Sequence, residues 1–344
     1  MAHSSVGHEK SESALISAAK AGNEAAFRAL IEPLDRELAA YAYRMLGGAQ
    51  DAEDALQETR LKAWRHLASY EPRAPFRAWV YRIATNTCLD LSKQGRRRVL
   101  PRELGVAPVA PGPPTTEPRS DIDWLEPYPD ALLPGPGTSD PEARLRLHES
   151  VRLAFVRAMQ VLPPRQRAAL ILHDVLDFGV DDVASMLETT PAAMNSALQR
   201  ARATVRRPPP APKESGAHHA EALAQFVHAW ETGDFDRLVA MLTEDAVMDM
   251  PPWMYWLDGR DAVAATFLGP GTWEGEPRPD RYRIVPVAMN GQPGGLAYVK
   301  GADGLYWPVC MTVMDLDVEG RIFDLTVFVL PEHFRAWGFP ASLT

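Results

Sequence analysis

One stretch of the chain combines aromatic and cationic side chains in a pattern suited to holding single-stranded nucleic acid. Residues 76–86 read Phe-Arg-Ala-Trp-Val-Tyr-Arg-Ile-Ala-Thr-Asn, and further basic residues follow. Bases stack on aromatic faces while cations track the phosphates, and an extruded base also needs polar groups that read its edge. Because Trp79 shares a helical face with Phe76 and Ile83, we expect it to fill a core instead. The candidates for DNA contact are Tyr81, Arg82, Asn86, Lys93, Arg96 and Arg97.

An acidic block lies upstream of this stretch and is suited to docking a protein partner. Residues 51–59 read Asp-Ala-Glu-Asp-Ala-Leu-Gln-Glu-Thr. A helix cap at Asp51 and a favourable helix dipole account for Asp51 and Asp54. They account less well for Leu61 and Trp64, which follow at the spacing of a partner-docking face. The candidates for this face are Asp51, Glu53, Asp54, Gln57, Glu58, Leu61 and Trp64.

A second basic region has the pattern of a helix–turn–helix. It opens at residues 162–167, Leu-Pro-Pro-Arg-Gln-Arg, and its last helix is predicted from Pro191 to about Arg206 with Thr190 as cap. Early exposed residues of a recognition helix reach base edges, and arginines reach phosphates. Arg165 is a further candidate phosphate contact, with a solvated helix face as the alternative. The candidates on the last helix are Ala192, Ala193, Asn195, Ser196, Gln199, Arg200 and Arg202, whereas Met194, Ala197, Leu198 and Ala201 should pack in the core.

Helices must position all of these residues. Residues 11–98 and 141–207 are predicted as two all-α domains, a helical bundle and the helix–turn–helix domain. Apolar residues recur at helical spacing over Ser13–Leu30, and we expect further helices from Phe76 to about Gln94 and from Pro141 to Met159.

Residues 99–140 are rich in proline, glycine and acid and are predicted as a linker with little regular structure. Within them, residues 123–129 read Asp-Trp-Leu-Glu-Pro-Tyr-Pro. Aromatic side chains are costly to leave in water. We therefore expect this island to dock on the folded protein.

The last third, residues 217–344, changes character. An amphipathic helix is predicted over Ala217–Leu242, and strand-like runs follow it. Helix first and sheet afterwards indicate an α+β domain. The predicted strands are Ala246–Met250, Tyr282–Met289, Leu296–Val299, Tyr306–Asp317 and Arg321–Val329.

The charge of the chain is divided between its parts. The net charge of −9 looks unfavourable for a DNA-binding protein, but residues 217–344 hold 8 Lys and Arg against 18 Asp and Glu, which is −10. The other 216 residues hold 28 against 27, or +1. This split favours nucleic-acid contact by the two helical domains and little of it by the last third.

Composition narrows the class further. The two cysteines, Cys88 and Cys310, lie far apart without metal-type spacing, so we expect neither a disulfide framework nor a metal site, and a cytoplasmic protein. The polar N-terminus lacks the apolar region of a secretory signal. No apolar run is long enough to span a membrane.

Taken in order, these motifs resemble those of bacterial extracytoplasmic-function sigma factors. The resemblance covers roughly residues 11–98 and 141–206. It implies that the Asp51–Trp64 helix binds core RNA polymerase, mainly the β′ subunit and with β as a further partner. It also implies that Phe76–Asn86 melts and reads the minus-ten element of promoter DNA and that the second domain reads the minus-thirty-five element.

The last third resembles a SnoaL-like domain, a cone of curved sheet and helices around a pocket. The similar segments are 226–236, 242–246 and 259–263. Fused sigma factors carry this domain as a regulator, and the island at 124–129 resembles their linker motif. The resemblance implies an aromatic pocket lining of Pro252, Trp253, Tyr255, Trp256, Trp273, Tyr306 and Trp307, and a possible small-molecule ligand.

We expect no catalysis and no cofactor. His228, Asp249 and Asp258 are the only residues that we would nominate as a general base. The ordinary explanation is stronger, with His228 on a helix surface and Asp258 in a turn before Gly259, and a fold does not by itself confer chemistry. The sequence thus favours an alternative sigma factor controlled by its own last domain. The alternatives are a helix–turn–helix regulator that works without polymerase, and an enzyme with a small-molecule pocket in the last domain.

Overall fold

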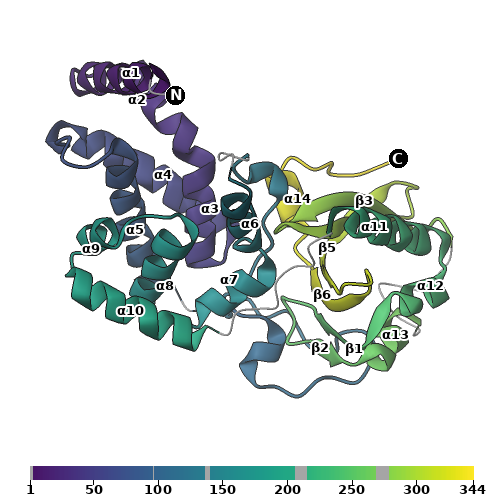
Figure 1. Cartoon of the computed structure of the whole chain (residues 1–344). Helices are drawn as coiled ribbons and strands as arrows, with labels where there is room; N and C mark the ends of the chain where they lie inside the picture. The colour runs from purple at the N-terminus through teal and green to yellow at the C-terminus, as the bar shows by residue number, and fades with distance from the viewer. Residues whose placement is uncertain (1–2, 96, 136–139, 206–214, 269–278) are drawn as a thin grey trace. The chain divides into compact units, whose positions relative to one another are not determined.

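The computed structural model of the chain describes residues 3–95, 97–135, 140–205, 215–268 and 279–344. The chain divides into two compact units. The first unit comprises residues 1–97, 132–150 and 158–206, and the second comprises residues 98–131, 151–157 and 207–344. Figure 1 shows the helices of the first unit in purple, blue and teal, and the strands of the second in green and yellow.

The first part of the first unit is a bundle of helices. The expected helical repeat over Ser13–Leu30 is interrupted: Gly22 adopts φ +93°, and Asn23 accepts a hydrogen bond from the Ala26 N–H to begin a new helix. Gly47, with φ +77°, ends α3. Asp51 does not cap α4 as expected, because Gly48 is the cap and Asp51 lies in the first turn. The helices are α1 His3–Lys20, α2 Glu24–Ile31, α3 Asp35–Leu46, α4 Ala49–His66 and α5 Phe76–Gln94.

The second part of the first unit is the helix–turn–helix. Helices run from Pro141 to Gln160, as expected, with a break near Ser150, and the second of them, α7, is divided between the two units. Thr190 accepts a hydrogen bond from the Ala193 N–H and caps α10, as predicted. The elements are α6 Pro141–Glu149, α7 Leu153–Gln160, α8 Pro164–Leu170, a π-helical turn Ile171–Val175, α9 Val180–Met186 and α10 Pro191–Thr204.

A buried arginine joins the two parts of this unit. The Arg167 guanidinium donates to the Met45 carbonyl oxygen at the end of α3 and to Gln160 at the end of α7. Arg167 is only 5% exposed, and burial lowers its pKa to about 10. The Arg167 guanidinium is therefore a structural contact between helices and is not accessible to a DNA phosphate in this conformation.

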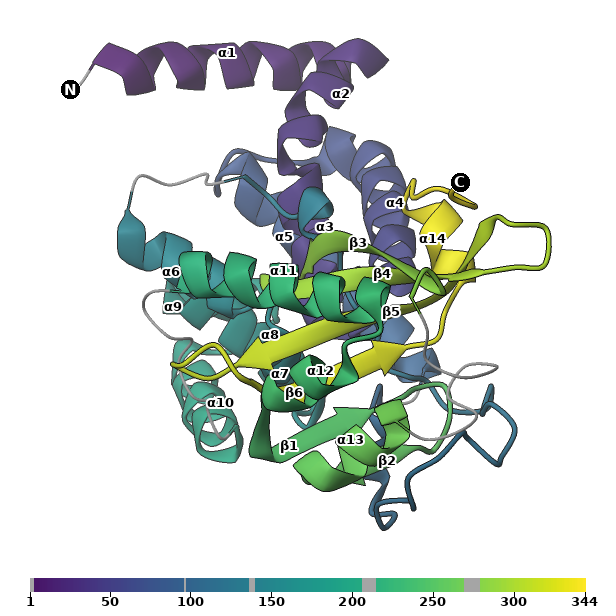
Figure 2. The same cartoon turned by 90° about the vertical axis from the view of Figure 1, so that its right-hand side faces the viewer.

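The second unit is built on one six-stranded sheet in the order β2-β1-β6-β5-β4-β3. Its neighbours are antiparallel except for β1 and β6, which are parallel. Helix α11 packs on β3 and β4 and lies across the sheet in Figure 2. The elements are α11 Ser215–Thr232, α12 Phe235–Ala240, β1 Leu242–Asp249, β2 Trp256–Asp258, α13 Arg260–Leu268, β3 Tyr282–Met289, β4 Gln292–Lys300, β5 Tyr306–Leu316, β6 Ile322–Phe328 and α14 Glu332–Ala336.

Alternation along the strands gives this sheet two different faces. Met248, Met314 and Leu325 lie in the hydrophobic core that α11 helps to cover. Successive strand residues point to opposite faces. Their neighbours Asp249, Asp315 and Asp324 therefore belong to the other face, where buried carboxylates need partners.

The linker covers much of the face of the sheet that carries these aspartates. Val99 pairs with Trp124 in a parallel bridge, and Leu100 and Leu125 are fully buried. Tyr128 is 3% exposed and exchanges backbone and side-chain hydrogen bonds with Asn290. The expected docking of the island is confirmed, and this docking occurs inside the second unit.

Candidate functional site

One face of α4 presents the residues expected to bind a protein partner. Glu53, Asp54 and Gln57 are exposed, and Leu61 is an unusual apolar member of this stripe, with 51% of its surface exposed. The side chain of Gln57 donates to Glu53 at 3.2 Å. An acidic stripe that ends in an exposed leucine offers both charge and apolar area to a partner.

Three predicted members of this face lie differently, and one of them, Asp51, is half-buried in the first turn of α4. Trp64 is half-buried, with its ring 5.0 Å from that of Phe27, so it helps to join α4 to α2. Glu58 is also half-buried and lies 3.6 Å from the Lys62 amine. The exposed stripe of α4 is therefore narrower than the candidate face predicted from sequence.

Helix α5 presents some of its predicted DNA contacts and covers others. Arg82 is exposed and pairs with Glu188 of the helix–turn–helix part at 2.8 Å. Lys93 is exposed and pairs with Asp90 at 2.9 Å, Asn86 and Arg97 are exposed, and Arg96 lies outside the described residues.

Tyr81 is not exposed as expected. Its ring lies edge-on to Tyr41 and to Phe178, at 5.4 and 5.1 Å, and the side chain is fully buried. Burial raises the pKa of its hydroxyl well above the usual value. Arg77 stacks over both Tyr81 and Phe178. In this conformation the base-stacking residue predicted on α5 is thus covered by the helix–turn–helix part.

Helix α10 carries its predicted residues on one outer face. Met194, Leu198 and Ala201 are buried, as the periodicity predicted. Arg202 pairs with Asp174 at 2.5 Å, and Arg165, ahead of this helix, is exposed. The exposed residues of α10 include Ala192, Ala193, Asn195, Ser196, Gln199, Arg200 and Arg202.

One cavity in the second unit is small and apolar. It has a volume of about 30 Å³ between α11, α13 and the sheet, and its lining includes Trp230, whose indole N–H has no hydrogen-bond partner among the described residues. None of the described residues expected to line it from sequence does so, and Trp273 lies outside the described residues. The Trp256 indole donates instead to the Val106 carbonyl oxygen in the linker, and Trp307 is 44% exposed. The lining among the described residues is Phe226, Trp230, Met248, Met250, Thr266, Phe267, Tyr282, Ile284, Ala297, Val309, Cys310, Thr312, Leu325 and Val327.

The three nominated general bases do not meet at this cavity. His228 and Asp258 are exposed on α11 and at the end of β2. Asp249 is buried on the opposite face of the sheet. Among the described residues that line the cavity, there is no carboxylate or imidazole to act as a base.

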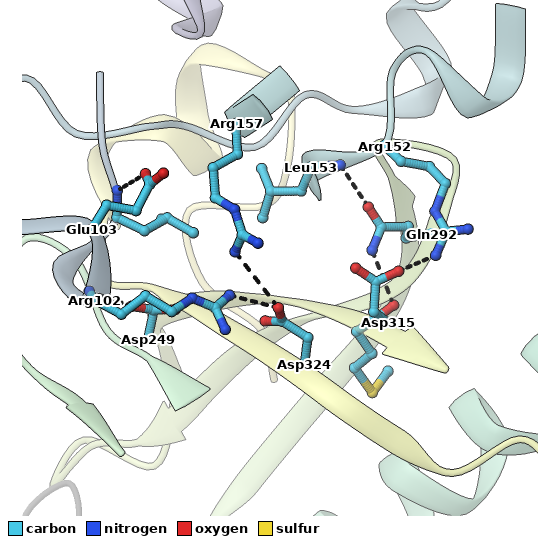
Figure 3. Close-up of polar contacts among 11 residues, drawn as sticks. Arg102, Glu103, Arg152, Leu153, Arg157, Asp249, Gln292, Asp315 and Asp324 are labelled. Carbon is cyan, nitrogen blue, oxygen red and sulfur yellow. Dashed lines mark hydrogen bonds and ion pairs between the residues drawn. The ribbon is translucent and has the colours of Figure 1, made fainter. Parts of the chain in front are cut away.

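That opposite face holds a cluster of buried ions, drawn in Figure 3. Arg102 of the linker lies 2.8 Å from Asp249 of β1 and 2.5 Å from Asp324 of β6. Arg157 of α7 lies 3.7 Å from Asp324, and Arg152 pairs with Asp315 of β5. Three chain segments that are distant in sequence thus meet through opposite charges.

Burial dominates the electrostatics of this cluster. Burial raises the pKa of Asp249 to about 6, and the nearby Arg102 guanidinium opposes that rise. Burial likewise raises the pKa of Asp324. The guanidiniums of Arg102 and Arg157 lower both pKa values, but they do not cancel the effect of burial. The sequence signal for this cluster was an aspartate in each of three largely apolar strands, next to a residue whose side chain points into the core.

Comparison with known proteins matches each part of this chain to a family. Residues 30–98 match Sigma-70 region 2, residues 152–205 match Sigma-70 region 4, and residues 223–299 match the SnoaL-like domain. Together with the helical bundle, the exposed α4 stripe and the helix–turn–helix, they define a promoter-specificity factor of RNA polymerase. The chain belongs to the ECF RNA polymerase sigma factors.

The relatives extend over all three parts. The ECF sigma factor SigG of Mycobacterium tuberculosis is 38% identical over 328 residues, which cover 92% of this chain and 85% of SigG. SigJ of the same organism is 28% identical over 315 residues, 88% of this chain and 91% of SigJ. The crystal structure of SigJ matches with a TM-score of 0.55 at 24% identity, over 91% of this chain and 99% of that one, and so shows the same fold.

As a member of this family, the chain is an alternative sigma factor that directs transcription initiation, with core RNA polymerase and promoter DNA as its partners. Among the described residues, none of the helices is long and apolar enough to cross a membrane. Nor does the described part of the chain gather three or more potential metal ligands.

Proposed function

We propose that the exposed stripe of α4, ending in Leu61, is the surface on which core polymerase docks, with the β′ subunit as the main contact. The observation that carries this assignment is the 51% exposure of a leucine among acidic side chains. A large apolar side chain exposed within a polar rim is typical of an interface centre. Polymerase acts in the cytoplasm, where we expect this chain to work.

The outer face of α10 is proposed to read the minus-thirty-five element. Asn195, Gln199 and Arg200 are exposed on this face. The side chains of Asn and Gln pair with adenine edges, and that of Arg200 would reach a phosphate. Arg82, Asn86 and Lys93 of α5 are proposed to contact the minus-ten strand, while Tyr81 would join them only after Phe178 moves away.

The SnoaL-like domain is proposed to regulate without catalysis. Its cavity, about 30 Å³, has room for little more than one water molecule as it stands. The unpartnered indole N–H of Trp230 could donate to a small apolar ligand that carries one acceptor, once side chains move. An enzyme would need a base at this cavity, and the lining described above offers none.

Reconstitution with core polymerase on a promoter library tests these assignments. The full-length chain should give promoter-specific transcripts, and a chain ending at residue 216 should give them at a different level. The absence of specific transcripts with either chain would contradict the DNA and polymerase assignments. Equal transcription and equal core affinity for both chains would contradict regulation by the last domain.

A further inference from the structure

The hairpin turn between β3 and β4 reverses the chain and also binds other segments of the second unit. Met289 pairs with Gln292, so the turn residues are Asn290 and Gly291, with φ of +58° and +65°. Asn-Gly is the pair that most readily adopts two successive positive φ angles. The turn is also buried, since Asn290 is 0% exposed and Gln292 is 3% exposed.

Buried amides need partners, and these two find theirs in other segments. The Asn290 amide donates to the Val151 carbonyl oxygen at 2.7 Å and accepts from the Tyr128 N–H at 2.9 Å. The Gln292 side chain accepts from the Leu153 N–H at 2.8 Å. Because Leu153 is the first residue of α7, Gln292 satisfies one of the N–H groups that a helix leaves open at its start.

Two ion pairs hold the same short segment. Arg152 pairs with Asp315, and their side chains are 13% and 7% exposed. Arg157, one helical turn further on, lies 3.7 Å from Asp324. All of these contacts lie within the second unit, and Figure 3 shows both pairs and the Gln292 contact side by side. The segment Val151–Arg157 is thus held by both amides and both carboxylates.

We propose that the Asn290–Gln292 turn, with Asp315 and Asp324, is an intramolecular docking site that captures Val151–Arg157, the start of region 4, and so restrains region 4 from promoter DNA. The capture neutralises Arg152 and Arg157 in a domain that must attract phosphates. It also fixes the start of α7, and α7 leads into the helix–turn–helix. This proposal rests on the function proposed above and identifies the segment through which the last domain acts.

The first test removes the capture without unfolding the turn. Asn290→Gly keeps a residue suited to positive φ but deletes the amide that binds Val151. Asp315→Asn removes the charge that holds Arg152. Asp280→Asn is the matched control, because it breaks the exposed pair with Arg283 at a residue that also has positive φ.

Hydrogen exchange and transcription are then measured on the same full-length proteins. In Asn290→Gly and Asp315→Asn, amide exchange over Val151–Arg157 should rise about tenfold or more. Promoter-specific transcription with core polymerase should rise about fivefold, as expected for a modest coupling free energy. Asp280→Asn should match the wild type in both.

The charge exchange Arg152→Asp with Asp315→Arg should return both readouts toward wild type, although each single change raises them. Faster exchange over the segment with unchanged or lower transcription would overturn the proposal, because the contact would then be structural only. Unchanged exchange in both variants would overturn it as well. Failure of the wild-type chain to support any specific transcript would instead remove the proposed function, whatever the exchange shows.

Discussion

A single exposed leucine distinguishes the proposed polymerase-binding side of α4 from an ordinary solvated helix. Leu61 is 51% exposed at the end of an acidic stripe, so its side chain contributes little to the folded state. Burial of such a side chain against a partner is worth about 1.5–3 kcal/mol. Leu61 should therefore matter for binding and hardly for stability.

We expect Leu61→Asp to weaken core-polymerase binding by about tenfold or more while leaving the unfolding free energy within about 0.5 kcal/mol of wild type. Binding titrations and denaturant unfolding measure the two quantities. Leu145→Asp is the matched control, because Leu145 is equally exposed, at 50%, on α6. Equal losses of affinity in both variants would point to general surface effects rather than to a docking site.

The raised pKa of Asp249 makes the unfolding free energy depend on pH, and the direction of the pKa shift fixes the direction of that dependence. Its pKa is about 6 in the folded chain against the usual 3.8, so between these values the folded state binds more protons than the unfolded chain. The unfolding free energy should therefore fall as the pH rises from about 4 to about 6, by up to about 3 kcal/mol from this group. Asp249→Asn should remove that contribution. Denaturant unfolding across this range checks it, and parallel curves for the two proteins would contradict it.

At the scale of elements, α10 shows how much of a helix can be predicted from the apolar periodicity of its sequence. Its buried residues, its Thr190 cap and its exposed face all follow from sequence, because a capped amphipathic helix has one stable way to lie on a core. Helix α5 shows the opposite. The bounds of α5 were predicted correctly, but Tyr81 was expected to be exposed and is buried. Phe178 of the helix–turn–helix part covers that face of the helix.

Two residues on α10 should fail in different ways when each is replaced by alanine. Asn195→Ala should reduce discrimination at one base pair of the minus-thirty-five element, by about 1–3 kcal/mol. Arg200→Ala should weaken binding to all sequences alike and lower the salt dependence by about one phosphate contact. Competition binding on mutated promoters at several salt concentrations separates the two. A base-specific effect of Arg200→Ala would reverse their assigned roles.

At the scale of the whole chain, residues 98–131, most of the linker, belong to the second unit together with the last domain. Leu100, Trp124 and Leu125 are buried within the second unit, and Arg102 is held by two aspartates of its sheet. Removal of residues 217–344 therefore removes the partners of these side chains as well as the last domain itself. Any truncation experiment tests both changes together.

A chain ending at residue 216 should expose this segment. We expect trypsin to cleave it after Arg98, Arg102 or Arg119 much faster than the full-length chain, because these sites lose their packed surroundings. Limited proteolysis followed by mass spectrometry measures the rates. Replacing Trp124 by alanine in the full-length chain should produce a weaker form of the same change, and unchanged cleavage of the truncated chain would contradict the docking.

The sequence by itself determined the family and most element bounds, because motif spacing and apolar periodicity are local properties. It also determined the three folds: the helical bundle, the helix–turn–helix and the α+β domain. The DNA-facing and polymerase-facing residues remain predictions, though the exposure of Leu61 and of the α10 face agrees with them. Only the tertiary structure decided which side chains meet across long separations. The pairing of Arg102 with Asp249 and Asp324, and of Val151–Arg157 with the β3–β4 turn, depends on strand register and on which face of the sheet is covered. Strand register and the covered face of the sheet are set by tertiary packing, so no local sequence pattern identifies the partner of a given side chain.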